Sequence, residues 1–252
     1  MGGTTIRWLL RAVETAVRLP TFARTGQFGD GREAAVRDRV LARIPAGDPD
    51  AVLAAMDDFA RHSSMLVNVG DEKGLILDAA VSRTRPKVVL ELGTYCGYSA
   101  VRMARALPRN ARLVSVEFCA DNARVARAII AHAGLADRVS VVVGTIGDGG
   151  ETVQRLVDEH QFTPGTVDFI FIDHAKQAYL PDLKTILEAG WLHPGTVVVA
   201  DNVRIPGAPA YLAYMRGENG RSWRTVEHRT HVEYQSLFAD LVLESEYLGA
   251  PA

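Results

Sequence analysis

Residues 87–99 read KVVLELGTYCGYS and join a short β-rich run to two glycines placed four residues apart. The run KVVLEL (87–92) predicts a strand, and the residues near 98–107 predict a helix. Gly93 and Gly97 lie between the two, where glycine lets a ligand approach the backbone closely. The stretch therefore predicts a ligand-binding turn between a strand and a helix.

The same alternation of strand and helix continues along the chain. Further predicted strands are RLVSVE (112–117), VSVVV (139–143), VDFIFID (167–173) and TVVVAD (196–201). Helical patterns lie between the strands, near 121–133, 148–160 and 179–191. Several of the strands are apolar on both faces, as a central parallel sheet covered by helices requires. The alternation predicts a Rossmann-like, doubly wound α/β domain.

The end of the chain carries two further predicted strands, WRTVEHR (223–229) and DLVLESEY (240–247). An antiparallel hairpin at the sheet edge suits them, and it completes a mixed sheet of seven strands. Helices are predicted over 32–43 and 49–65. We expect residues 1–252 to form one domain.

Within that domain, residues 1–45 are expected to be a helical extension packed on a catalytic core of 46–252. Residues 5–19 show a helical pattern that Pro20 is expected to end. Its apolar face carries Ile6, Leu9, Leu10, Val13 and Val17. Packing of this face on the domain is the expected role, and the arginines opposite leave open a peripheral membrane contact.

The composition argues against several classes of protein. The 252 residues are 48% hydrophobic and 23% charged, with a formal net charge of −2. A chain this close to neutral does not indicate nucleic-acid binding through a broad positive surface. No apolar run approaches the ~20 residues of a membrane span. Cys96 and Cys119 fit neither a disulfide framework nor a zinc site, which predicts a reducing, cytoplasmic location. A monomer is expected.

Two acids flank the glycine turn. Glu117 ends the second predicted strand, where a carboxylate can accept hydrogen bonds from both hydroxyls of a ribose in NAD, FAD or S-adenosylmethionine. It could equally cap the following helix. Glu91 stands directly before the turn, where it favours the cationic S-adenosylmethionine over NAD, whose pyrophosphate it would repel. The turn also lacks the G-x-G-x-x-G pattern of dinucleotide sites.

Two other strands end in oxygen-bearing side chains, Asp173 on one and Asp201 with Asn202 on the other. If these strands are neighbours, the three side chains meet at the ligand-binding edge of the sheet. Carboxylate and amide oxygens suit Mg²⁺, and the absence of soft ligands disfavours zinc or copper. The alternative is that these acids are satisfied by helix N-termini.

Two residues close in sequence to these predicted ligands are candidates for a catalytic or a cofactor-binding role. Lys176 follows Asp173 by three residues and is a candidate general base. His174 could be a ligand or a base. We instead expect a cofactor contact, because adjacent side chains at a strand end point in opposite directions.

Five longer strings identify a resemblance: GDPDAVLAAMDDF (47–59), NVGDEKG (68–74), LELGTYCGYSAVRMAR (90–105), IDHAKQAYLPD (172–182) and GTVVVADNVRIPGAPAYLAYMRG (195–217). From about residue 45 onward, the chain resembles catechol O-methyltransferase. The resemblance implies S-adenosylmethionine as methyl donor, a Mg²⁺ ion and a small catechol as acceptor.

The resemblance also implies residue roles. The metal ligands would be Asp173, Asp201 and Asn202. The catalytic residues would be Lys176, as general base, and Glu233, which would hydrogen-bond the second catechol hydroxyl. The S-adenosylmethionine site would be lined by Val67, Val69, Glu91, Gly93, Tyr95, Ser99, Glu117, Ile146, Asp173 and His174. The acceptor would contact Met65, Lys176, Asn202, Pro206 and Glu233.

The chain departs from the family pattern in three places. Met65 and Ala175 stand where the family has tryptophans, and Ile146-Gly147 replaces a Ser-Gln pair. The acceptor slot is therefore expected to be wider or differently shaped. This keeps open a larger diphenol acceptor, such as a caffeoyl ester or a flavonoid. An NAD(P)-linked oxidoreductase and a non-enzymatic binding module are the remaining alternatives.

Overall fold

The computed structural model describes residues 2–235 and 237–249, with the side chains of its first helix described from Glu14 onward. The helices are α1 (Gly2–Thr25), α2 (Arg32–Arg43), α3 (Pro49–His62), α4 (Gly70–Thr84), α5 (Tyr98–Ala106), α6 (Ala120–His132), α7 (Glu151–His160), α8 (Tyr179–Glu188) and α9 (Pro209–Gly217). The strands are β1 (Val88–Leu92), β2 (Arg112–Glu117), β3 (Val139–Val143), β4 (Val167–Ile172), β5 (Leu192–Ala200), β6 (Trp223–His231) and β7 (Ala239–Tyr247). Two short helical turns are η1 (Lys176–Ala178) and η2 (Val203–Gly207).

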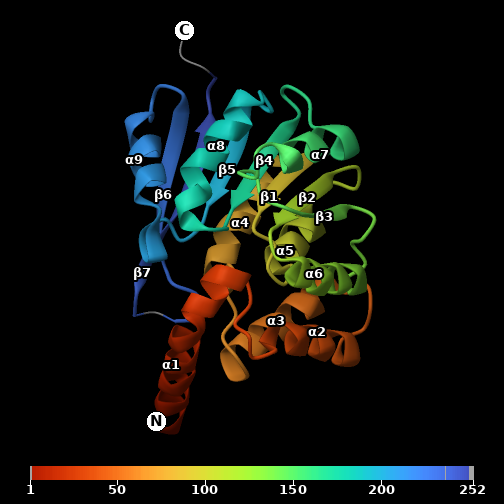
Figure 1. Ribbon diagram of the computed structural model, residues 1–252, viewed down its shortest axis with the longest axis vertical. Helices are drawn as coiled ribbons and strands as arrows, with labels where there is room; N and C mark the ends of the chain where they lie inside the picture. Colours follow the sequence, from red (N-terminus) through yellow and green to blue (C-terminus); the bar gives the residue numbers. More distant parts are fainter. Residues whose placement is uncertain (1, 236, 250–252) are drawn as a thin grey trace.

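The strands form one seven-stranded sheet in the order β3-β2-β1-β4-β5-β7-β6. β1 to β5 pair in parallel, and β7 pairs antiparallel with both β5 and β6. Helices lie on both sides of the sheet (Figure 1). The predicted doubly wound α/β fold, with its antiparallel C-terminal strands, is confirmed.

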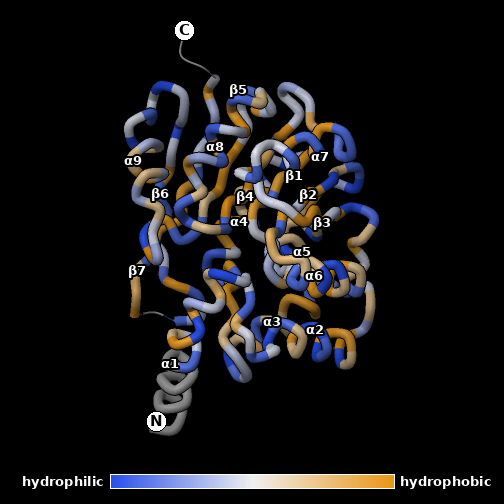
Figure 2. Tube along the Cα trace, viewed as in Figure 1, coloured by the Kyte–Doolittle hydropathy of each residue, from blue (hydrophilic) through white to orange (hydrophobic). Residues whose placement is uncertain are grey.

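Alternating residues of the central strands enter two separate hydrophobic clusters, because successive side chains of a strand point to opposite faces. In β4, Phe169 and Phe171 belong to the cluster that includes residues of α2 to α6. Ile170 and Ile172 belong to the cluster that includes residues of α7, α8 and α9. Figure 2 shows hydrophobic residues concentrated along these central strands. The two-sided burial explains why the strands read as continuous apolar runs.

Local sequence signals set the start of α3. Asp48 caps the helix by accepting a hydrogen bond from Ala51 N at 2.9 Å, and Pro49 occupies the first turn, where its missing N–H costs nothing. The helix ends at His62, three residues earlier than predicted.

The prediction that Pro20 ends the first helix is wrong, since α1 continues through it to Thr25. A proline inside a helix removes one hydrogen bond, at a cost of roughly 3 kcal/mol. Contacts beyond Pro20 offset this cost. Phe22 stacks on Phe28 with ring centroids 4.6 Å apart and meets Tyr95 edge-on at 5.8 Å.

The apolar face predicted for α1 is only partly described. The side chains of Ile6, Leu9, Leu10 and Val13 lie outside the described residues. Val17 is described and is 73% exposed, so its predicted packing on the domain is wrong. In the part of the chain that the structure describes, no helix has the length and hydropathy to cross a membrane.

The sequence did not predict α4 or α9. The buried positions of α4 are 70, 73, 74, 77, 80 and 81, which is the spacing of one helical face. Two glycines and Lys73 occupy part of this face, while Leu75 is 66% exposed. The helix therefore has a buried face without a matching apolar stripe, and hydrophobic periodicity does not detect it.

The core predicts a large effect for one substitution. Phe169→Ala removes a fully buried ring from the middle of β4 and should lower the free energy of unfolding by about 3–5 kcal/mol. Urea denaturation followed by circular dichroism measures this loss. Leu75→Ala, on the exposed face of α4, is the control and should change it by less than ~0.5 kcal/mol. Equal losses in the two variants would contradict the described core.

Candidate active site

The carboxyl ends of β4 and β5 lie side by side and carry the predicted metal ligands. The two strands are parallel neighbours, with Ile172 opposite Ala200. Asp173 and Asp201 are the next residues along each strand, and Asp201 N donates to Ile172 O at 3.0 Å. The adjacency on which the predicted site depends is therefore present.

The ammonium of Lys176 lies among oxygens from both strand ends. Its Nζ donates to Asp173 Oδ1 at 2.9 Å, to Asn202 Oδ1 at 3.4 Å and to Tyr179 OH at 2.5 Å. Tyr179 is fully buried and donates in turn to Asp201 O at 2.9 Å. The oxygens of Asp173 and Asn202 thus face one common cation, and Tyr179 fixes the position of that cation.

Asp201 is fully buried, and its two carboxylate oxygens differ. Oδ1 accepts from Asn202 N at 2.6 Å and pairs with Lys73 Nζ at 2.7 Å. Oδ2 has no hydrogen-bond partner among the described residues. Burial raises the pKa of the Asp201 carboxyl above its usual range, and the charge of Lys73 opposes that rise. A buried carboxylate oxygen without a partner is costly, so Oδ2 is suited to a cation.

Lys73 belongs to this site, although the sequence analysis assigned it no role. Its side chain is 1% exposed, and its Nζ contacts Asp201, Glu233 and, at 3.3 Å, Asp240. Burial alone would lower the pKa of Lys73. The charges of nearby carboxylates, with Asp201 contributing most, outweigh this effect and raise the pKa well above its usual range. Lys73 is therefore a permanent buried cation.

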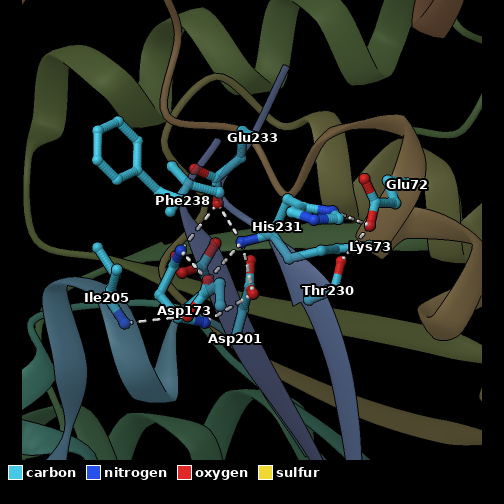
Figure 3. A network of polar contacts seen from close by, with 12 residues as sticks. Glu72, Lys73, Asp173, Asp201, Ile205, Thr230, His231, Glu233 and Phe238 are labelled. Atoms are coloured by element: carbon cyan, nitrogen blue, oxygen red, sulfur yellow. Dashed lines mark hydrogen bonds and ion pairs between the residues drawn. The ribbon is translucent and has the colours of Figure 1, made fainter. Parts of the chain in front are cut away.

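Asn202 is oriented by two acids. Its Nδ2 donates to Glu233 Oε1 and to Asp240 Oδ2, each at 2.9 Å, which turns Oδ1 toward Lys176. Its backbone is left-handed, with φ at 51°, a conformation that asparagine tolerates better than most residues. Figure 3 shows this network, including Lys73, Asp173, Asp201 and Glu233. A cavity of about 320 Å³, with Lys73 and Glu233 among its lining residues, lies beside it.

The glycine turn after β1 packs against the end of β4. Gly93 has φ at 97°, and a Cβ there would lie 2.6 Å from Asp173 O. Only glycine fits both the conformation and the close approach. The turn therefore lies directly beside the candidate metal ligands, which brings the predicted cofactor site and the predicted metal site together.

Glu91 is completely buried before this turn. Its Oε2 accepts from Ser115 Oγ, while Oε1 is without a hydrogen-bond partner in the described part of the chain. Burial raises the pKa of Glu91 to about 7, against the opposing hydrogen bonds of Ser115 and Ser99. Oε1 is therefore free to accept a hydrogen bond from a bound cationic group.

Glu117 holds the turn in shape. Its Oε2 accepts from Thr94 N at 3.1 Å and Tyr95 N at 2.8 Å, and its Oε1 accepts from Cys119 N at 2.9 Å. Burial raises the pKa of Glu117, and these backbone donors oppose the rise. The bond to Cys119, at the start of α6, is a capping role. The predicted ribose contact stays a prediction beside it.

His174 is turned toward a residue that the sequence did not single out. Its Nε2 lies 2.9 Å from Asp182 Oδ2, and its ring stacks on Tyr179 at 5.1 Å. Its Nδ1 is buried and has no hydrogen-bond partner within the described ranges. The ring thus engages Asp182 while Asp173 engages Lys176, so the two neighbouring side chains have separate partners.

The other predicted site residues differ in exposure. Buried side chains are Val69, Ser99 and Ile146, of which Ile146 belongs to the apolar core. Half-buried side chains are Met65, Val67 and Tyr95, and the exposed one is Pro206. Ala175, which stands at a family tryptophan position, is also exposed.

Comparison with known proteins shows that this chain is similar to O-methyltransferases. The sequence profile of the O-methyltransferase family matches residues 48–210. A probable O-methyltransferase of Mycobacterium tuberculosis is 64% identical over 225 residues, which are 89% of this chain and 96% of that protein. Catechol O-methyltransferase B of Danio rerio is 50% identical over 203 residues, which are 81% of this chain and 74% of the fish protein.

Solved structures support the fold. The O-methyltransferase TomG of Streptomyces achromogenes, in complex with SAM, has a TM-score of 0.63 at 23% identity and covers 85% of this chain and 96% of its own. An O-methyltransferase of Bacillus cereus, in complex with SAH, has a TM-score of 0.60 at 24% identity, covering 94% and 99%.

The raised pKa of Glu91 predicts a pH-dependent stability. The folded protein keeps this proton up to about pH 7, whereas the ordinary pKa is 4.5, so stability falls as pH rises between these values. Glu91→Gln is neutral at every pH and should remove this decline. Without ligand, its Tm should exceed that of the wild type by at least a few °C at about pH 8, where 1 kcal/mol corresponds to roughly 2–4 °C.

Differential scanning calorimetry of both proteins over a pH series measures this effect. The Tm difference should shrink toward acid pH, where Glu91 is protonated in both folded and unfolded chains. A difference that is constant with pH would show that Glu91 does not titrate as described.

Proposed function

The chain belongs to the O-methyltransferase family, and from this premise we propose that it methylates one hydroxyl of a Mg²⁺-bound catechol with S-adenosylmethionine. The observation that carries the proposal is the meeting of Asp173, Asn202 and the unpartnered Asp201 Oδ2 at one sheet edge. These are hard oxygen donors, as Mg²⁺ prefers. The high identity to named catechol O-methyltransferases supports the acceptor class.

Three features support the S-adenosylmethionine site. Glu91 Oε1 is a buried acceptor without a partner, which suits the ammonium of the methionine part. Gly93 brings the backbone turn close to the end of β4. Glu117 at the end of β2 stands where a carboxylate can also accept from ribose hydroxyls.

Bound Mg²⁺ would lower the pKa of a coordinated hydroxyl, and S-adenosylmethionine would supply an electrophilic methyl group. Lys176 would receive the proton that the acceptor hydroxyl releases. It would do so as a neutral amine, once bound Mg²⁺ had replaced its ammonium at Asp173 Oδ1 and Asn202 Oδ1, which lie 2.9 Å and 3.4 Å from Nζ. Glu233 accepts a hydrogen bond from the second hydroxyl. Lys73 and Asn202 hold the Glu233 carboxylate in place. Orientation of the reactants can contribute roughly 7–11 kcal/mol.

The acceptor slot is the part of the site in which this chain differs from the family. Ala175 is exposed and Met65 is half-buried, so neither position supplies the broad aromatic wall that a tryptophan would provide. This favours, as a second candidate, a larger vicinal diphenol such as a caffeoyl ester or a flavonoid. The metal, base and donor would be the same.

We also propose that the protein is a monomer located in the cytoplasm. Cys96 and Cys119 are both free thiols in the structure, which fits a reducing compartment. Size-exclusion chromatography of the purified chain tests the monomer.

A methyl-transfer assay tests the reaction class. We expect turnover of catechol and caffeate in the presence of Mg²⁺, none with excess EDTA, and none for a monophenol. The reason is that one hydroxyl loses its proton at the ion while the adjacent hydroxyl hydrogen-bonds Glu233. Product formation from S-adenosylmethionine is measured by liquid chromatography. Metal-independent methylation of the monophenol would contradict the proposal.

Lys176→Ala tests the base. We expect kcat to fall by at least ~100-fold, the usual contribution of a positioned base, while the Kd for S-adenosylmethionine stays unchanged in calorimetry. Lys184→Ala, which removes an exposed lysine of α8, is the matched control and should keep full turnover. Wild-type turnover in Lys176→Ala would remove this residue from the mechanism.

A further inference from the structure

Lys73 stands where three carboxylates converge. It lies in the first turn of α4, with Nζ 2.7 Å from Asp201 Oδ1, 3.3 Å from Asp240 Oδ2 and in close contact with Glu233 Oε1. Carboxylate oxygens of these three acids all lie within 4.8 Å of one another. Figure 3 shows the amine of Lys73 directed into this group from the side opposite Phe238 and Ile205.

Three converging carboxylates are also the donor set of a divalent-ion site. Hard cations such as Mg²⁺ and Mn²⁺ bind such oxygens at about 2.0–2.6 Å. The Lys73 ammonium already occupies the centre of the group and is itself 1% exposed. A divalent ion could bind these oxygens only if the Lys73 ammonium left them, because the repulsion between two cations in a buried site is large.

We propose that Lys73 is an internal cation that takes the place of a second divalent ion in the Asp201–Glu233–Asp240 cluster. It thereby limits the centre to one metal ion, on the Asp173 and Asn202 side of Asp201. The location of that one ion rests on the proposed function. The exclusion of a second ion rests on the contacts of Lys73 alone.

The two carboxylate oxygens of Asp201 have different roles in this proposal. Oδ1 is engaged by Lys73 and by Asn202 N, whereas Oδ2 has no partner in the described chain. A carboxylate can bridge two metal ions about 3.5–4 Å apart when both oxygens are free. By holding Oδ1, Lys73 leaves Asp201 one oxygen for metal. It is a positioning residue and not a catalytic one.

The charge of the site agrees with a single ion. Four carboxylates, those of Asp173, Asp201, Glu233 and Asp240, surround the amines of Lys73 and Lys176. The acids carry two more formal charges than the two amines neutralise. One divalent ion balances this excess. A second ion would leave the group with two excess positive charges, and replacing Lys73 by a neutral residue would reduce this excess to one.

Binding of Mn²⁺, counted by electron paramagnetic resonance of the free ion, tests the inference on the full chain. Wild type should bind one ion. Lys73→Met, which keeps the length of the side chain and removes its charge, should bind two. Lys73→Met combined with Asp240→Asn should return to one, because the second site loses a ligand. Lys87→Met, the same change at an exposed lysine, is the matched control and should bind one.

Asp240→Asn alone keeps the test decisive if Lys73→Met fails to fold. The inference predicts that this variant binds one Mn²⁺ ion, because Lys73 remains in place. Asp240 also accepts a hydrogen bond from Asn202 Nδ2, a candidate metal ligand, so the number of bound ions and not the Kd is the readout. Two bound ions in this variant, in which Lys73 is unchanged, would overturn the inference.

Two outcomes separate this inference from the proposed function. One ion in both wild type and Lys73→Met overturns the role of Lys73 and leaves the proposed metal site intact. No ion in wild type and one in Lys73→Met, lost again with Asp240→Asn, removes the proposed metal site and supports the role of Lys73.

Discussion

Burial of negative charge at the carboxyl edge of the sheet is the constraint on which the rest of the site depends. Glu91, Glu117, Asp201 and Asp240 are all less than 5% exposed there. A buried carboxylate is costly unless cations or hydrogen-bond donors surround it. Each of these acids meets that requirement with different groups, and the differences divide the edge into separate regions.

Glu117 is satisfied by backbone donors of the glycine turn and of the α6 start, so it is mainly an organiser of local structure. Asp201 and Asp240 share the ammonium of Lys73. Glu91 Oε1 and Asp201 Oδ2 are left without partners among the described residues. These two oxygens lie on β1 and directly after β5, which flank β4. The proposed cationic methyl donor and the proposed divalent ion would therefore bind next to each other.

The residues proposed for the reaction and the residues proposed to contact the acceptor lie on different elements. The candidate metal ligands and the Lys176 amine follow the ends of parallel strands, whose positions are fixed by the hydrogen bonds of the sheet. Met65 and Ala175 lie in connections and Pro206 lies in the turn η2, all outside the strands of the sheet. A change of acceptor size is thus compatible with an unchanged reaction centre, since the two depend on different elements.

The sequence alone determined the strands, most of the helices, and the position of Asp173, Asp201 and Asn202 directly after strands. Each of these follows from local patterns: buried strands read as apolar runs, and residues that follow neighbouring parallel strands share one edge. Only the tertiary structure decided the course of α1 through Pro20, the presence of α4 and the role of Lys73. The buried face of α4 contains glycine and lysine, and the acids that pair with Lys73 lie more than 120 residues away. Periodicity reports which side of an element is apolar. It does not report a buried charge whose partners come from distant parts of the chain.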